Sequence, residues 1–190
     1  MITRKQALDL LHKHMQNPNL RRHCYAVESV MRALARHFNE DEDVWGIAGL
    51  LHDADYEITK DKEPKKDHTK HVLEWLRQLE AETDIYDAVA AHAWGYVEGA
   101  PEPKTKMQWA LYTCDELTGL IVAVALVKPD KKLASVTVDS IMKKWNQRAF
   151  AGGVKREQIA ECEPRLGIPL RDFIQIALEA MQSISEDLGL

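Results

Sequence analysis

Cysteine is scarce in this sequence, and long apolar segments are absent. Cys24, Cys114 and Cys162 are odd in number and have no CxxC spacing, which favours reduced thiols in a cytosol over a disulfide framework. The longest apolar run, residues 120–127, is far shorter than the roughly 20 residues needed to cross a bilayer, and we interpret it as a buried helix end. The amino-terminal residues lack the apolar core of a secretory signal. We therefore expect a cytoplasmic protein with no membrane partner.

The sequence also lacks an excess of positive charge. Its 25 Lys and Arg residues against 30 Asp and Glu residues give a net charge of -5, which removes the general attraction on which nucleic-acid binding depends. We expect no nucleic-acid polymer as a partner. The 190 residues, 45% of them hydrophobic, suffice for one domain with a substantial core, so we treat residues 1–190 as a single domain. The sequence leaves open whether the protein forms a homo-oligomer.

Strand patterns are limited to a few residues, whereas helix signals recur along the whole chain. Helix starts are indicated by a capping side chain or a proline, which is well tolerated there, at Thr3, Asn17, Asp41, Thr105 and Pro169. Between these starts apolar residues recur at spacings of three and four, as on one face of a helix. The sequence predicts an all-α bundle of roughly seven to nine helices.

Eight histidines are many for a chain of this length, and the positions of some indicate a metal site. His52 and Asp53 close an apolar helical segment, where an unpaired carboxylate is costly to bury. His23 and Asp115 each lie on the apolar stripe of another predicted helix. A divalent cation held between facing helices of a bundle would relieve this cost, and imidazole with carboxylate suits a borderline or hard ion.

The order His, His-Asp, Asp resembles the metal signature of the HD superfamily of metal-dependent phosphohydrolases. The segments RRHCYAV, WGIAGLLHDADYE and YTCDELTGL resemble its first, second and last metal-binding helices, most closely those of a group of predicted HD hydrolases. The resemblance implies an HD-type helical bundle, with a metal-binding core at about residues 18–127 and a C-terminal helical part at residues 128–190. It implies that the metal ligands include His23, His52, Asp53 and Asp115.

Two further histidines decide between one metal ion and two. In binuclear HD enzymes additional histidine ligands fall between the HD pair and the last Asp, and His68 and His92 occupy such positions. Asp53 would then bridge two ions; in the mononuclear alternative the two histidines contact substrate or activate water. His71 competes with His68, which we prefer because the core position Val72 follows it by four residues. The ion could be Mn, Fe, Co, Ni, Mg or Zn.

The resemblance implies that metal-activated water attacks the phosphorus of a small phosphorylated metabolite, a nucleotide or a related phosphoester. Asp53 would orient this water as well as bind metal. Asp55 and Glu57 follow in the segment DADYE and are candidates for supporting the ligands or carrying a proton; the alternative is that they are exposed loop acids. The sequence does not distinguish a phosphomonoesterase from a phosphodiesterase. A non-catalytic nucleotide-binding or sensor module is the alternative function.

A phosphate substrate also needs cations from the protein. Lys143, Lys144 and Arg148 lie near one predicted helical face in the basic C-terminal part and are our candidates for substrate binding, with solvated surface charge as the alternative. Trp94 and Tyr96 follow closely after the predicted ligand His92, so these rings either stack on a base or pack within the protein.

Overall fold

The computed structural model describes residues 2–61 and 64–190, where helices are the only regular secondary structure. This confirms the all-α fold class predicted from the sequence. In chain order the helices are α1 (Arg4–His14), α2 (Pro18–Phe38), α3 (Glu42–Leu51), α4 (Tyr56–Thr59), α5 (Pro64–Asp67), α6 (Lys70–Gln78), α7 (Thr83–His92), α8 (Lys106–Leu126), the 3-10 turn η1 (Leu133–Ser135), α9 (Val138–Trp145), α10 (Arg156–Ala160), α11 (Cys162–Leu166), α12 (Leu170–Ser183) and α13 (Ser185–Leu188).

Within the described residues, eight helices have eight or more residues each, which agrees with the predicted number. Five others, α4, α5, α10, α11 and α13, have only four or five residues. Sequence patterns could not predict the four-residue helices α4 and α5, because about one turn is too little to establish a helical period.

Capping contacts confirm the predicted starts of the first three helices and of α8. The hydroxyl groups of Thr3 and Thr105 accept a backbone N–H three residues later and complete capping boxes. The side chains of Asn17 and Asp41 accept backbone N–H groups of the first helical turn. Pro169 precedes the first residue of α12 rather than opening that helix.

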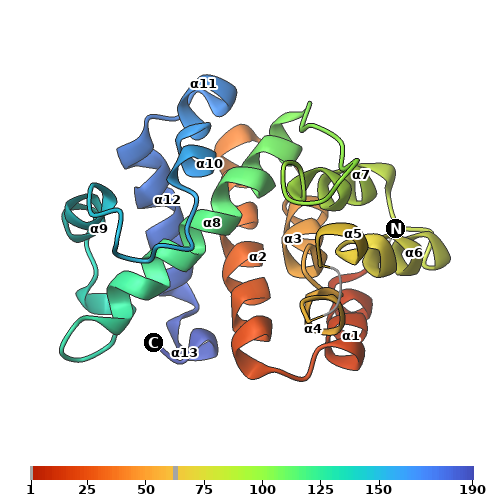
Figure 1. Ribbon diagram of the computed structural model, residues 1–190, viewed down its shortest axis with the longest axis horizontal. Coiled ribbons are helices and arrows are strands. Elements are labelled where there is room, and N and C mark those ends of the chain that lie inside the picture. The colour runs from red at the N-terminus through yellow and green to blue at the C-terminus, as the bar shows by residue number, and fades with distance from the viewer. Residues whose placement is uncertain (1, 62–63) are drawn as a thin grey trace.

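Helices α2, α3 and α8 form the centre of the fold (Figure 1). Helix α2 packs against α3, α8 and α12, while α7 packs against α3 and α8. The approach of α2 to α3 is close: a Cβ added to Gly49 would lie 3.0 Å from the Cα of Glu28 and 3.0 Å from the carbonyl oxygen of Val27. Glycine at this position lets the two backbones meet, and the C-terminal end of α3 therefore lies beside α2.

Helix α8 has the length and composition of a membrane-spanning helix, but 67% of its most apolar 18-residue stretch is buried inside the fold. The core helix of a globular domain has the same properties, so this is weak evidence for a membrane span. The buried helix end predicted for residues 120–127 is largely confirmed as far as Ala125. It is wrong for Leu126 and Val127, which are 50% and 59% exposed, because α8 ends there and the chain turns to the surface.

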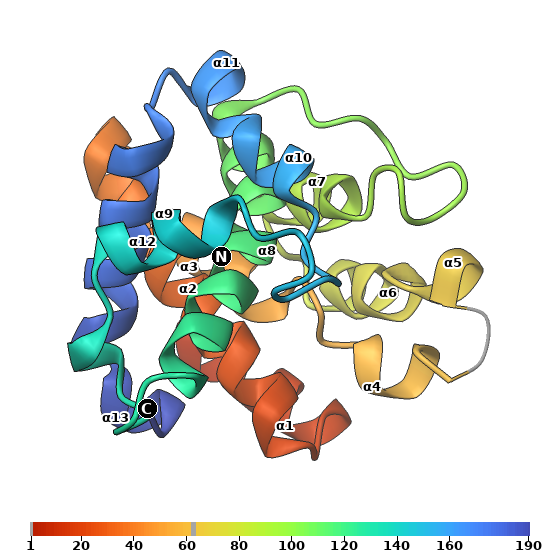
Figure 2. The ribbon, with the colours of Figure 1, turned by 60° about the vertical axis from the view of Figure 1, so that its left-hand side comes forward.

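The C-terminal helices pack on the central helices. Helix α12 lies against α2 and α8, α9 lies against α12 and α8, and both α10 and α11 lie against α8. Between α9 and α10 the chain forms a loop, residues 146–155, which runs beside α8 in Figure 2. This loop brings part of the C-terminal segment close to the residues of α8.

Candidate metal centre

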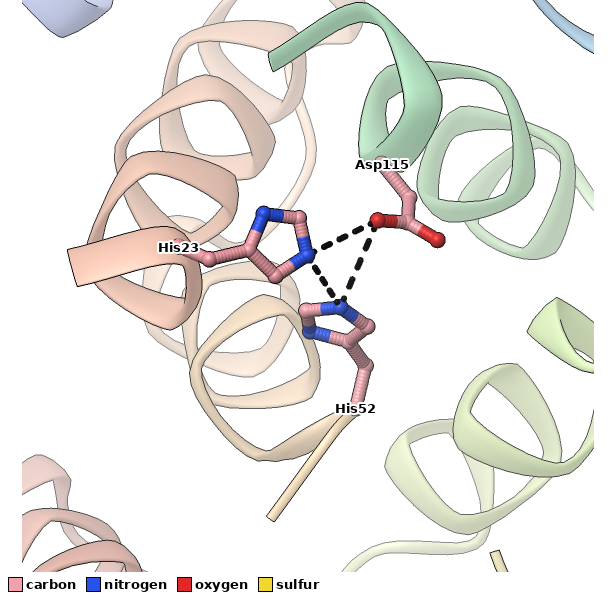
Figure 3. A group of neighbouring side chains, drawn as sticks. All are labelled: His23, His52 and Asp115. Carbon is pink, nitrogen blue, oxygen red and sulfur yellow. Dashed lines mark hydrogen bonds and ion pairs between the residues drawn. The ribbon is translucent and has the colours of Figure 1, made fainter. Parts of the chain in front are cut away.

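Three helices bring His23, His52 and Asp115 together (Figure 3). His23 lies in the second turn of α2, His52 directly follows α3, and Asp115 lies near the middle of α8. Nε2 of His23 is 2.9 Å from Oδ1 of Asp115 and 3.2 Å from Nε2 of His52. Nε2 of His52 is 3.6 Å from the same Asp115 oxygen. These side chains converge on one point, and we name them the first group.

Asp53, His68 and His92 form the second group. Oδ1 of Asp53 lies 3.3 Å from Nε2 of His68 and 3.4 Å from Nε2 of His92, and the two imidazole nitrogens are 3.1 Å apart. The other oxygen of Asp53, Oδ2, lies 3.8 Å from Nε2 of His23 and 3.7 Å from Nε2 of His52. One carboxylate thus connects the two groups, with one oxygen toward each.

The second ring nitrogen of each histidine in the two groups faces an oxygen of the protein. For two of the histidines the acceptor is the backbone carbonyl three residues earlier in the chain. Nδ1 of His52 donates to the carbonyl of Gly49 at 2.7 Å, and Nδ1 of His92 donates to the carbonyl of Val89 at 2.5 Å. These bonds fix the orientation of both rings.

The other two histidines are held by side chains. Nδ1 of His68 donates to Oδ1 of Asp55 at 3.0 Å. Nδ1 of His23 lies 3.4 Å from Oγ1 of Thr118, whose own proton goes to the carbonyl of Asp115. In its neutral form each of the four rings therefore presents an unprotonated Nε2 to the centre, as metal-binding histidines do.

The acids make this centre favourable for positive charge. Burial opposes the charged forms of His52 and His68, but nearby carboxylates outweigh it and raise the pKa to about 9 for His52 and about 10 for His68. For His92 burial dominates and lowers the pKa. Burial also opposes ionisation of Asp53 and Asp115, yet the histidines hold the pKa of both carboxyls well below their usual range. Ionised carboxylates facing imidazoles attract either protons or a metal ion.

The donors fit divalent ions in type and in spacing. Imidazole and carboxylate bind such ions at about 2.0 to 2.2 Å, so donors that share one ion lie roughly 3 to 4 Å apart. The donor atoms of the first group are separated by 2.9 to 3.6 Å and those of the second by 3.1 to 3.4 Å. The neighbouring thiols stay neutral, because burial raises the pKa of Cys24 and Cys114. Each group could hold one borderline or hard divalent ion.

Asp55 supports this centre from outside it. Its buried carboxylate accepts not only Nδ1 of His68 but also the backbone N–H groups of Thr69 at 3.2 Å, His71 at 3.1 Å and Val72 at 3.3 Å. Neither oxygen is left free to carry a proton. Of the two roles considered for Asp55, the geometry therefore fits the support of a ligand.

His71 lies away from the centre. Its side chain is exposed and stacks on Trp75, with ring centroids 6.2 Å apart. His68, in contrast, is only 3% exposed and faces Asp53. The structure therefore brings His68 rather than His71 to the second group.

Glu57, the other predicted catalytic acid, points elsewhere. Its Oε2 accepts the backbone N–H groups of Gln16 at 2.6 Å and Asn17 at 2.9 Å, where the chain turns from α1 into α2. Glu57 is also not among the described residues that line the cavity beside the first and second groups. We correct the predicted catalytic role, because a contact with residues about 40 positions earlier in the chain occupies this carboxylate.

A cavity of about 380 Å³, here called the metal cavity, opens at the two groups. Its wall includes the aromatic side chains of Tyr56, Trp94 and Tyr96. The rings of Tyr56 and Tyr96 stand edge-on to His68, with centroids 5.5 and 6.0 Å away. Trp94 also packs edge-on against Trp109 at 6.0 Å, so it combines a packing contact with a face in the cavity.

The three cations predicted to bind substrate are outside the described lining of the metal cavity. Lys143 is exposed on α9, Lys144 bonds to a glutamine of its own segment at 3.0 Å, and Arg148 lines a separate cavity. Among the described residues of the metal cavity, the one Lys or Arg is Lys155. Helical spacing could not place Arg148 or Lys155, because α9 ends at Trp145 and both lie in the loop beyond it.

Comparison with known protein families matches residues 20–125 to the HD domain. The match covers more than half of the chain, extends from α2 into the last turn of α8, and contains both groups of metal-binding candidates. No curated protein matches the sequence. The order of the donors, the helical fold and the family match agree, and the chain therefore belongs to the HD domain family.

Proposed function

We propose that the protein is a metal-dependent phosphohydrolase acting on a small phosphorylated metabolite, a nucleotide or a related phosphoester. The main support for the proposal is that the Asp53 carboxylate faces both groups, with Oδ2 toward the first group and Oδ1 toward the second. Two donor sets joined by a carboxylate suit a pair of divalent ions, which phosphatases and nucleases use for phosphoester cleavage. One ion would be held by His23, His52, Asp53 and Asp115, and the other by Asp53, His68 and His92.

When bound, divalent ions supply polarisation of a phosphoryl oxygen and activation of water at neutral pH. The protein supplies orientation: hydrogen bonds at Nδ1 hold the four imidazoles, and Asp53 orients the attacking water as well. In the reaction water gives up one proton and its oxygen bonds to phosphorus. The bond from phosphorus to the leaving oxygen breaks, and that oxygen takes up a proton.

The metal cavity supports a small phosphorylated substrate. Its volume of about 380 Å³ lies within the range of about 300 to 1,000 Å³ found for small-molecule sites. Lys155 provides a cation for an anionic group of the substrate, and Trp94 and Tyr96 provide aromatic surface on which a base can stack. These features favour a nucleotide over a metabolite without a planar group.

The test is hydrolysis by the full chain with added Mn²⁺, Co²⁺, Ni²⁺ or Mg²⁺, measured as phosphate or p-nitrophenol released from monoesters, diesters and a panel of nucleotides. We expect metal-dependent turnover that is lost in Asp53→Asn and kept in Asp9→Asn, which changes an exposed carboxylate on α1. Turnover that survives Asp53→Asn would contradict the proposal. Nucleotide binding without turnover across the panel would favour the sensor module instead.

A further inference from the structure

The segment from residue 145 to residue 160 lines a second cavity of about 480 Å³, here called the loop cavity. Gly153 and Lys155 line both this cavity and the metal cavity, so the two cavities adjoin. In Figure 2 the loop that carries both residues lies beside α8, the helix of Asp115. The two cavities therefore share part of one wall, and a molecule bound at the metal groups that reached past Gly153 and Lys155 would enter the loop cavity.

Arg156 holds the loop in shape. Its guanidinium donates to the carbonyl oxygens of Trp145 at 2.8 Å and Phe150 at 2.7 Å, and to three further carbonyls of the same segment at 3.3 to 3.5 Å. The backbone N–H of Lys155 donates to Oε2 of Glu116 at 3.1 Å, which ties the loop to α8 directly beside the metal groups. The loop is therefore a wall with a defined shape.

The two cavities differ in the balance of their charges. Apart from its histidines, which face the metal groups, the metal cavity is lined by more acids than bases, with Asp53, Asp115 and Glu116 against Lys155. The loop cavity has the opposite balance, with Arg148, Lys155 and Arg156 against Glu157. Bound metal ions would attract a phosphate to the first cavity, whereas the protein itself attracts an anion to the second.

Two of the loop cations have side chains available for a ligand. Nζ of Lys155 lies over the ring of Tyr96, 5.2 Å from its centroid, and the guanidinium of Arg148 is exposed. Neither side chain lies within salt-bridge distance of a carboxylate in residues 2–61 and 64–190, and the charge of Lys155 acts on Glu116 at longer range. A guanidinium can bind a carboxylate or a phosphate through two parallel hydrogen bonds.

We propose that the loop cavity is a subsite for the leaving group of the substrate, and that Arg148 and Lys155 select phosphoesters whose leaving group carries a second negative charge. The proposal rests on the phosphohydrolase function proposed above. The phosphate to be cleaved lies at the metal groups, and the second anion lies between Arg148 and Lys155. An uncharged leaving group gains nothing from these cations.

The test uses two probes that cannot be hydrolysed and that differ by one carboxylate, phenylphosphonate and 4-carboxyphenylphosphonate. Calorimetry gives the Kd of each probe for the full chain loaded with Mn²⁺. We expect the wild type to bind the carboxylated probe about tenfold more tightly, as one hydrogen bond between charged groups can produce. Arg148→Ala should bring the two Kd values together, and Arg148→Lys should keep part of the difference. Lys132→Ala, which removes an exposed cation lining neither cavity, should behave as the wild type.

Hydrolysis of phenyl phosphate and 4-carboxyphenyl phosphate is measured in parallel. Equal Kd values for the two probes in the wild type, or an unchanged difference in both Arg148→Ala and Lys155→Ala, would overturn the subsite. A wild type that prefers the carboxylated probe but hydrolyses neither ester nor any nucleotide of the panel would support binding of the second anion in the loop cavity and contradict the phosphohydrolase function. Hydrolysis of both esters without preference for the carboxylated probe would support the phosphohydrolase function and contradict the subsite.

Discussion

Oδ1 of Asp55 accepts a hydrogen bond of 3.0 Å from Nδ1 of His68, although 13 positions separate the two residues in the chain. The same buried carboxylate accepts three backbone N–H groups at the start of α6. It therefore holds the imidazole and the helix that follows it in one arrangement. Partners of this kind fix the tautomer and the orientation of a metal-binding histidine.

Asp55→Asn should weaken binding at the second group more than at the first. An amide has one oxygen in place of two and cannot accept all four hydrogen bonds. We expect affinity for one of two ions to fall about 10- to 100-fold and the free energy of unfolding to fall by about 1 to 3 kcal/mol. Calorimetric titration with Mn²⁺ and urea unfolding measure the two effects. Asp67→Asn, which changes a partly exposed carboxylate paired with Lys70, is the control; equal behaviour of the two variants would contradict a supporting role.

The number of bound ions should depend on the second group. We expect wild type to retain about two ions per chain and His92→Ala to retain about one, because the first group keeps all its donors. His71→Ala should retain the wild-type number, since that side chain is exposed and stacks on Trp75. Mass-spectrometric metal analysis of dialysed protein gives the counts. A wild type with one ion that His92→Ala does not affect would support the mononuclear alternative.

Side chains on long helices were the predictable part of the site. His23 and Asp115 could be predicted to point inward because the apolar period of a helix alone decides which face is buried. His52 and Asp53 stand out for another reason, since they end a segment whose other residues are almost all apolar. His68 and His92 could be named only through a family resemblance, because no local pattern relates their spacing to the first group.

Loop residues and distant contacts were not predictable. Lys155 reaches the metal cavity because Arg156 holds the loop in shape and Glu116 ties it to α8, and no local sequence pattern indicates the contact with Glu116, 39 positions earlier in the chain. Glu57 is close to the HD pair in sequence but is occupied by backbone groups at residues 16 and 17. In both cases tertiary contacts decide where the side chain points.

The metal-free protein should lose stability as pH rises above neutrality. The pKa values of His52 and His68 are raised from the ordinary 6.5 to about 9 and about 10, so the folded state holds protons that the unfolded state releases. The resulting stability is complete below pH 6.5 and is lost as pH rises through 9 and 10. We expect the Tm of EDTA-treated protein to fall across this interval and to fall less steeply in His68→Gln. Metal-loaded protein should resist the loss, because bound metal replaces these protons. A level Tm in the EDTA-treated wild type would be evidence against this charge state.

The contact between α2 and α3 should make Gly49 intolerant of even a methyl group. A Cβ at Gly49 would lie 3.0 Å from the Cα of Glu28, whereas at Gly119 the nearest such atom is a side-chain carbon 3.9 Å away. We expect Gly49→Ala to lower the free energy of unfolding by about 1 to 3 kcal/mol. It should also weaken metal binding, since the Gly49 carbonyl holds Nδ1 of His52. Gly119→Ala should be neutral or stabilising by up to about 1 kcal/mol, because alanine favours a helix over glycine. Urea unfolding of EDTA-treated protein compares the two variants directly, and equal stabilities would mean that the helices can separate without cost.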